Sequence, residues 1–181
     1  MEIAKLKSEM TNKIQEILWR QFGAGIDMLI NLISSCPEHF LSDNKRFYYL
    51  AYHSIVFLDY YSSIPPDSFE PVLPFTMLSP EQRPAESIGD MIPDRIYTRQ
   101  ELLGYLKNIR LKCNKLIINP TIEEYVDLRF TEGQEQDDMD YPLFEILLYN
   151  LRHTQHHVGQ LNLIIRQESD THMEWIFQAD K

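Results

Sequence analysis

The chain has 181 residues, of which 44% are hydrophobic and 12% aromatic, and this composition excludes a largely disordered protein. The length favours a single domain, residues 1–181, over two small ones. A formal net charge of −10, without any cluster of lysine or arginine, argues against a nucleic-acid partner.

The cysteines and the first residues indicate the compartment. Cys36 and Cys113 form no paired motif, which is typical of proteins in a reducing compartment. The opening MEIAKLKSEMTNKI lacks the basic and then apolar order of a signal peptide. No run of about 18 apolar residues occurs that would span a membrane. We therefore expect a cytoplasmic protein that makes no contact with a membrane.

A long first helix is predicted at the start of the chain. Apolar residues recur at helical spacing from Ile3 to Ile33, and the pair Cys36-Pro37 ends the pattern. Gly23 and Gly25 weaken helix propensity in its middle. They predict either a kink or a close crossing with another helix.

The second predicted helix runs from about Asn44 to Ser63. Its segment FYYLAYHSIVFLDYY is apolar nearly all round, so we expect burial on more than one face, with part of it at a dimer interface. Seven of the ten prolines follow between Ile64 and Pro93. Because proline interrupts helices, residues 64–97 are predicted to form a long crossover.

The third helix is predicted to begin at Thr98, which forms a T-x-x-E capping box with Glu101. Asn119-Pro120 ends it. A turn and one short helix are expected after Thr121. The acidic stretch EGQEQDDMD that follows is typical of an exposed loop leading into the electropositive start of a helix.

The fourth helix is predicted from about Tyr141 to Gln167, with Pro142 in its first turn. The apolar tail 175–177 is expected to dock on the helices or on a neighbouring subunit. Four long helices without convincing strand patterns predict an all-α four-helix bundle, in which the proline-rich crossover joins helices two and three.

Three of the six histidines lie inside the apolar pattern of the fourth helix. At about 100° per residue, His157 falls within the apolar arc and His153 at its edge, whereas His156 points away. Histidines four residues apart on one helical face can reach a single ion. His53, in the most apolar segment of the chain, is the candidate third ligand because a buried imidazole needs a partner.

The residues alone leave other interpretations open. An interior histidine is commonly hydrogen-bonded to a carbonyl, and a pair with this spacing commonly lies at a surface. His39 and His172 are assigned to solvent. The identity of the metal stays open as well, because imidazole binds zinc, nickel, copper and iron.

Two further side chains are candidates for the surroundings of the metal. Gln160 could orient a ligand imidazole or bind a metal-bound water, or could simply bond another helix. His156 could act as an outer acid or base, or could lie at a solvated rim. Thr154 follows His153 where a metalloprotease would have glutamate, and no Glu-x-x-His pair of a di-iron centre occurs around the histidines.

The interior His53, the proline-rich crossover and the string LLYNLRHTQHHVGQLNLIIRQ resemble the DinB-like (DinB/YfiT) family over most of the chain. The first and third histidines of its H-x-x-H-H-x-G-Q motif, here His153 and His157, match the family's ligands, as does His53. The resemblance implies a four-helix bundle, often dimeric, that holds nickel, zinc or another divalent ion on three histidines. Some members transfer low-molecular-weight thiols.

The expected protein is thus a homodimeric enzyme with one zinc, nickel or iron ion, which activates a thiol or water against a small-molecule substrate. The alternative is a non-catalytic, stress-related scaffold in which the metal closes helices two and four together. An open coordination position would favour the enzyme, whereas a fourth protein ligand would favour the scaffold.

Overall fold

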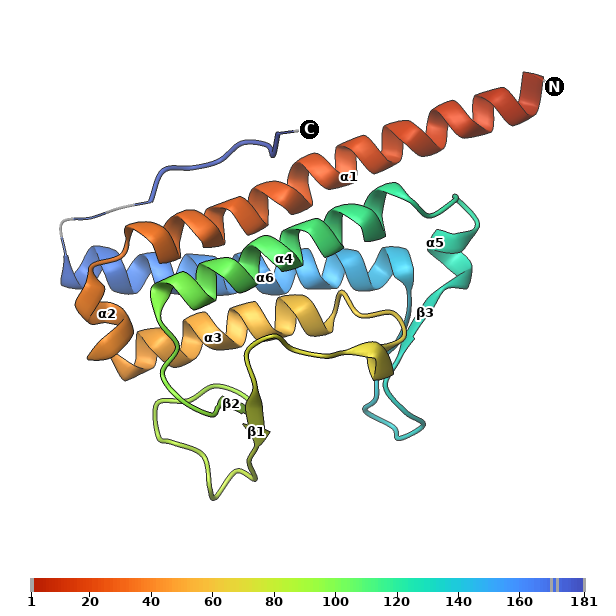
Figure 1. Cartoon of the computed structure of the whole chain (residues 1–181). Helices are drawn as coiled ribbons and strands as arrows, with labels where there is room; N and C mark the ends of the chain where they lie inside the picture. The colour runs from red at the N-terminus through yellow and green to blue at the C-terminus, as the bar shows by residue number, and fades with distance from the viewer. Residues whose placement is uncertain (1, 170, 172, 181) are drawn as a thin grey trace.

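A computed structural model gives the structure of residues 2–169, 171 and 173–180. This part of the chain is mostly helical, with two small two-stranded sheets. The four longest helices are α1 (Glu2–Ser35), α3 (Lys45–Tyr60), α4 (Arg99–Ile118) and α6 (Leu143–Glu168). They lie side by side (Figure 1), with α1 and α3 each packed against both α4 and α6. None of the helices described is long and apolar enough to cross a membrane.

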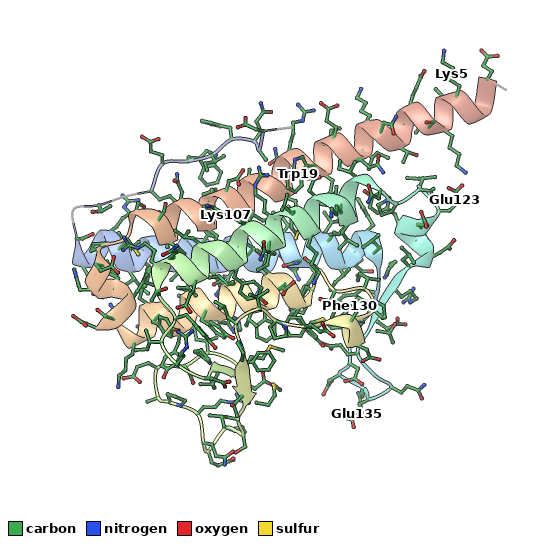
Figure 2. The ribbon with its side chains drawn as sticks, in the orientation of Figure 1. Lys5, Trp19, Lys107, Glu123, Phe130 and Glu135 are labelled. Atoms are coloured by element: carbon green, nitrogen blue, oxygen red, sulfur yellow. The ribbon has the colours of Figure 1, made fainter. Side chains whose placement is uncertain are left out.

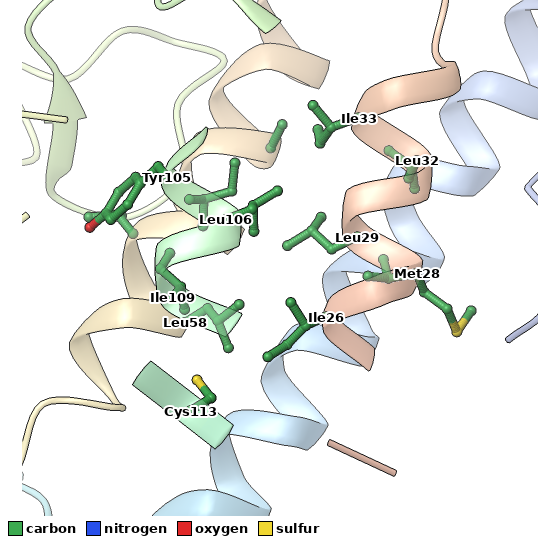
Figure 3. Packing of buried hydrophobic residues seen from close by; sticks show 14 of the residues in the cluster. Ile26, Met28, Leu29, Leu32, Ile33, Leu58, Tyr105, Leu106, Ile109 and Cys113 are labelled. Atoms are coloured by element: carbon green, nitrogen blue, oxygen red, sulfur yellow. The ribbon is translucent and has the colours of Figure 1, made fainter. Parts of the chain in front are cut away.

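The hydrophobic core fills the space between these helices. Figure 3 shows Ile26 and Leu29 of α1 facing Leu106 and Ile109 of α4, and all four side chains are buried. Burial of an aliphatic side chain contributes roughly 1.5–3 kcal/mol. The helical spacing of apolar residues in the sequence thus correctly predicted that these side chains face the core.

The predicted close helix crossing is present at Gly25. A Cβ atom on this residue would lie 2.8 Å from Nε2 of Gln155 and 3.2 Å from Cδ1 of Leu151, both on α6. A larger side chain would push these groups away. Glycine here lets α1 approach α6 closely.

The second predicted helix is observed as α3, and a short helix that was not predicted, α2 (Glu38–Ser42), precedes it. The Asn44 side chain caps α3 by accepting a hydrogen bond from the Phe47 amide at 2.9 Å. The helix is buried on most sides, because α4 and α6 cover one side and the crossover covers another. The wide burial expected from its sequence is thus achieved within one chain.

The crossover contains one 3-10 turn, Pro66–Ser68, and a two-stranded antiparallel sheet of β1 (Phe75–Met77) and β2 (Met91–Pro93). A second such sheet pairs β3 (Arg129–Thr131) with β4 (Asp140–Pro142). Neither hairpin was predicted: the described residues are mostly helical, as expected, but they are not purely α. Each strand has three residues, which is too short to show the alternation by which strands are recognised.

Two tyrosine hydroxyls of α3 bond to the backbone of the crossover, and the hydroxyl of Tyr97 links two parts of the crossover to each other. The Tyr48 hydroxyl donates to the Arg95 carbonyl at 2.9 Å and accepts from the Tyr97 amide at 2.7 Å. The hydroxyls of Tyr52 and Tyr97 both donate to the carbonyl of Pro74, at 3.2 and 2.6 Å. A long segment without regular helices is held in one place by these bonds.

The predicted capping box starts α4, and both of its hydrogen bonds between Thr98 and Glu101 are present. The short helix expected after Thr121 is α5 (Glu124–Asp127). The acidic stretch forms the exposed loop between β3 and β4, with Glu135 at its tip (Figure 2). Pro142 then occupies the N-cap of α6, one position before the predicted first turn.

A buried charged network ties α3 to α4. Asp59 is 5% exposed and accepts hydrogen bonds from the Tyr105 hydroxyl at 2.5 Å and from Nζ of Lys112 at 2.6 Å. Nζ of Lys112 also donates to the Ser63 hydroxyl at 2.6 Å. The carboxylate is thus compensated by a cation and a hydroxyl, as a buried charge requires.

The C-terminal tail runs back along α1 (Figure 1). The Ala179 amide donates to the Arg20 carbonyl at 2.9 Å, and the buried Ala179 side chain lies against Gly23. Docking of the tail on the helices was predicted, but the apolar rings do not provide it. Trp175 is 64% exposed and Phe177 is 81% exposed, whereas Ile176 between them is partly buried against the core, so Ile176, Ala179 and backbone hydrogen bonds hold the tail.

Candidate metal centre

The structure brings His53, His153 and His157 together between α3 and α6. His53 lies in the middle of α3, and the other two lie one turn apart on α6. Nε2 of His153 is 3.3 Å from Nε2 of His53 and 3.0 Å from Nε2 of His157. His53 and His157 are 7% and 6% exposed, whereas His153 is half-buried. Candidate ligand atoms of the three rings thus converge on one point, with His153 the least buried of the three.

The spacing of the Nε2 atoms fits a divalent metal ion. Zinc binds imidazole at about 2.0–2.1 Å, which places two tetrahedral nitrogen ligands roughly 3.3 Å apart. The observed distances of 3.0 and 3.3 Å match this value. Candidate ligand atoms of these three residues all lie within 4.8 Å of one another.

Hydrogen bonding among the three rings explains this arrangement poorly. Nδ1 of His157 donates to Oε1 of Gln160 at 2.8 Å, so Nε2 of a neutral His157 carries a lone pair. If Nε2 of His153 carries a hydrogen, that single hydrogen must serve the contacts with both His53 and His157. If it carries none, its lone pair faces the lone pair of His157 Nε2 at 3.0 Å. A cation that accepts all three lone pairs removes this conflict.

Burial lowers the pKa of all three imidazoles, and their neighbouring histidines lower it further. The pKa of His53 falls to about 3 and that of His153 to about 4. Burial also lowers the pKa of His157, although its hydrogen bond with Gln160 acts in the opposite direction. The nearby backbone of Ile88 also opposes the lowering of the pKa at His53. All three rings are neutral at pH 7, the form that binds metal.

The two predicted neighbours of the ligands, Gln160 and His156, are both exposed but contact His157 in different ways. Gln160 is exposed, and its side chain hydrogen-bonds the His157 ring rather than another helix. His156 is also exposed, as the helical geometry predicts, and its ring packs edge-on against His157 at 5.0 Å between centroids. Gln160 therefore orients a candidate ligand, whereas His156 lies at the solvated rim.

Aromatic side chains enclose the rings. Phe57 packs against His53 with 4.4 Å between centroids, and Tyr61 meets His153 edge-on at 5.5 Å. The Tyr149 ring lies nearly parallel to His153, at an interplanar angle of 10°. Sequence reasoning did not assign Phe57 or Tyr149 to the centre, although both lie one turn from a histidine on the same helix. Aromatic rings thus flank both His53 and His153.

The crossover covers the outer edge of His53. Gly89 has a positive φ of 73°, and a Cβ atom there would lie 3.0 Å from Nδ1 of His53 and 3.5 Å from Cε2 of Phe57. Sequence reasoning missed this contact. The available signal was the glycine itself, because a loop glycine commonly marks a backbone that turns through positive φ or passes close to another group.

No other histidine, cysteine, aspartate or glutamate of the described residues joins the cluster. The two cysteines are free and buried. His39, expected in a loop, lies in α2 and is exposed, while His172 lies outside the described residues. The described residues thus supply three candidate protein ligands to the centre.

Comparisons with protein-family models, with curated proteins and with solved structures find no match to this chain. The chemistry of the centre is therefore inferred from the geometry of its own residues.

Proposed function

We propose that this protein is a metal-dependent enzyme in which Nε2 of His53, His153 and His157 binds one zinc, nickel or iron ion. The observation that carries the proposal is the convergence of three buried or half-buried Nε2 atoms at 3.0 and 3.3 Å. Three neutral imidazoles, with no fourth histidine, cysteine or carboxylate among the described residues, are typical of catalytic rather than structural zinc sites.

The proposed chemistry is activation of a small nucleophile. A divalent ion bound by neutral ligands lowers the pKa of bound water to about 7 or deprotonates a bound thiol. Gln160 holds the His157 ring in the tautomer that leaves Nε2 free. The aromatic side chains of Phe57, Tyr61 and Tyr149 keep the surroundings dry, which strengthens electrostatic interactions within. The substrate class is a small electrophile attacked by water or by a low-molecular-weight thiol.

The wider proposal is a DinB-like four-helix bundle that acts as a cytoplasmic homodimer. Four long helices packed along one another support the bundle, with the proline-rich crossover between α3 and α4 as the family resemblance implies. The sequence LLYNLRHTQHHVGQLNLIIRQ of α6, which contains His153, His157 and Gln160, supports membership of the family.

The metal proposal is tested by elemental analysis of protein purified without a metal-affinity tag. We expect about one equivalent of metal in the wild type and little in His157→Ala. His156→Ala is the matched control, because it removes the adjacent imidazole, which is exposed and is not among the candidate ligands. Equal metal content in the two variants would overturn the ligand assignment.

The open position is tested with cobalt(II)-loaded protein and cysteine as the thiol probe. If a thiol reaches the metal, a thiolate-to-cobalt charge-transfer band appears, and a chelator that removes the cobalt abolishes it. If the cobalt spectrum is unchanged by cysteine and shows four protein ligands, the centre is closed. That result would overturn the enzymatic proposal and favour a scaffold in which the metal links α3 to α6.

A further inference from the structure

The outer nitrogen of His53 has no partner in the structure as described. Nδ1 of His53 is buried and makes no hydrogen bond. The corresponding atom of His157 does have one, on Oε1 of Gln160. When Nε2 of a neutral imidazole binds a metal, the proton resides on Nδ1, and an acceptor there fixes the ring and strengthens the bond to the metal. His53 therefore needs an acceptor that its own helix does not supply.

The Ile88-Gly89 turn of the crossover lies against this nitrogen. Gly89 approaches the ring so closely that a Cβ atom would be 3.0 Å from Nδ1 and 3.2 Å from Cε1 of His53. The backbone of Ile88 interacts with the same ring. A free backbone carbonyl is a common acceptor for the outer nitrogen of a metal-bound histidine.

The turn is anchored on its C-terminal side, which limits how far it can move. Immediately after the turn, the Asp90 carbonyl accepts a hydrogen bond from the Leu78 amide at 3.0 Å, and Met91 pairs with Met77 in the β1–β2 sheet. Further along, the crossover is anchored by Tyr48 and Tyr97. A short movement of the turn would thus bring the Ile88 carbonyl to the unpaired Nδ1 of His53.

We propose that the Ile88-Gly89 turn positions His53 for metal binding, with the Ile88 carbonyl accepting the Nδ1 proton of His53 once Nε2 holds the ion. This inference rests on the proposed metal centre and deepens it. Because linkage is reciprocal, metal binding and closure of the turn onto His53 favour each other. The crossover is then part of the centre, although it contributes no ligand, and Gly89 is a positioning residue.

The coupling is tested first on the wild type by hydrogen exchange. Metal-free protein and protein saturated with zinc are compared at the amides of residues 87–90. We expect zinc to slow exchange there several-fold, because the turn closes onto His53, and to leave the tip of the loop between β3 and β4 unchanged.

Variants at Gly89 provide the second test, with zinc affinity as the readout. Gly89→Ala places a methyl group against His53 and should weaken zinc binding about tenfold or more while keeping one equivalent at saturation. Gly104→Ala is the matched control, since a Cβ atom there meets nothing within 4 Å. Gly89→Asn separates the two effects of the substitution: asparagine tolerates positive φ better than alanine but still adds the Cβ atom.

The outcomes distinguish this inference from the metal centre itself. A wild type that binds no zinc overturns the proposed function. A wild type that binds zinc without slowed exchange at residues 87–90, together with Gly89→Ala of unchanged affinity, overturns only the coupling. Recovery of full affinity in Gly89→Asn would assign the loss to backbone strain, and would also overturn the role of the His53 contact. Weak binding in both variants, with slowed exchange in the wild type, supports it.

Discussion

Nδ1 of His157 donates a hydrogen bond to Oε1 of Gln160 at 2.8 Å, one turn further along α6. Such a contact fixes the tautomer of a metal ligand, and its loss commonly weakens metal binding 10–100-fold. We expect Gln160→Leu to lower zinc affinity by about this factor while one equivalent still binds at saturation. Gln160→Glu retains an acceptor and should stay close to the wild type. Isothermal titration calorimetry measures both, and equal affinities for the Leu variant and the wild type would exclude the positioning role.

The lowered pKa values predict how the stability of the metal-free protein depends on pH. In the unfolded chain the three histidines bind protons as the pH falls through about 6.5. In the folded protein His53 and His153 stay neutral until about pH 3 and 4. The unfolded state thus binds more protons between these values, so the free energy of unfolding should fall with pH from about 6.5 downward, by at most about 1.4 kcal/mol per pH unit for each histidine.

Urea denaturation of metal-free protein at several pH values between 7.5 and 5 measures this slope. Carboxylates also contribute to acid destabilisation, so the wild type is compared with His153→Gln, which removes one titrating ring. The variant should show a shallower slope. A slope that is the same in both proteins would mean that His153 titrates alike in the folded and unfolded states.

The Asp59–Lys112 pair predicts a large and non-additive loss of stability. Lys112→Met leaves the buried Asp59 carboxylate with only the Tyr105 hydroxyl, which should cost on the order of 3 kcal/mol. Asp59→Asn in the same chain removes the charge that is left uncompensated. The double variant should therefore lose less than the sum of the single variants in urea denaturation. Strict additivity would show that the two groups do not interact.

Gly23 predicts the behaviour of the C-terminal tail. A Cβ atom on Gly23 would lie 2.6 Å from Cβ of Ala179, closer than side chains tolerate, so Gly23→Ala should displace the tail from α1. The Ala179 amide, bonded to the Arg20 carbonyl, should then exchange its hydrogen faster, and carboxypeptidase should trim the tail sooner. Gly159→Ala is the control, since a Cβ atom there meets nothing within 4 Å. Protection unchanged in Gly23→Ala would show that the tail adjusts without undocking.

Features governed by local periodicity could be predicted from the sequence. The wheel of the fourth helix placed His153 and His157 on the inner face and His156 outside, because helix geometry alone fixes the relative directions of neighbouring residues. The capping box at Thr98 was likewise predicted, since its two partners lie three residues apart. His53 could be proposed because an imidazole in so apolar a helix needs a partner.

Features that depend on contacts between distant parts of the chain could not be predicted from the sequence. The strands β1 and β2 exist only because residues 75–77 meet residues 91–93, and neither segment is long enough to indicate a strand by itself. The approach of Gly89 to His53 spans 36 positions in the chain and depends on where the crossover is anchored. The tail was expected to dock through residues 175–177, of which Ile176 packs against the core, but the contact of Ala179 with Gly23 was not predicted.

The tyrosines that anchor the crossover have a consequence for how this protein can vary. The hydroxyls of Tyr48, Tyr52 and Tyr97 all bond to main-chain groups, so they recognise the path of the crossover and not its side chains. Most residues between the anchors are then free to change without loosening the attachment. Residues 79–87, beyond the last paired position of the β1–β2 hairpin, could accept an inserted peptide or a fluorescent label. Such an insertion would leave in place the tyrosine hydrogen bonds that hold the crossover.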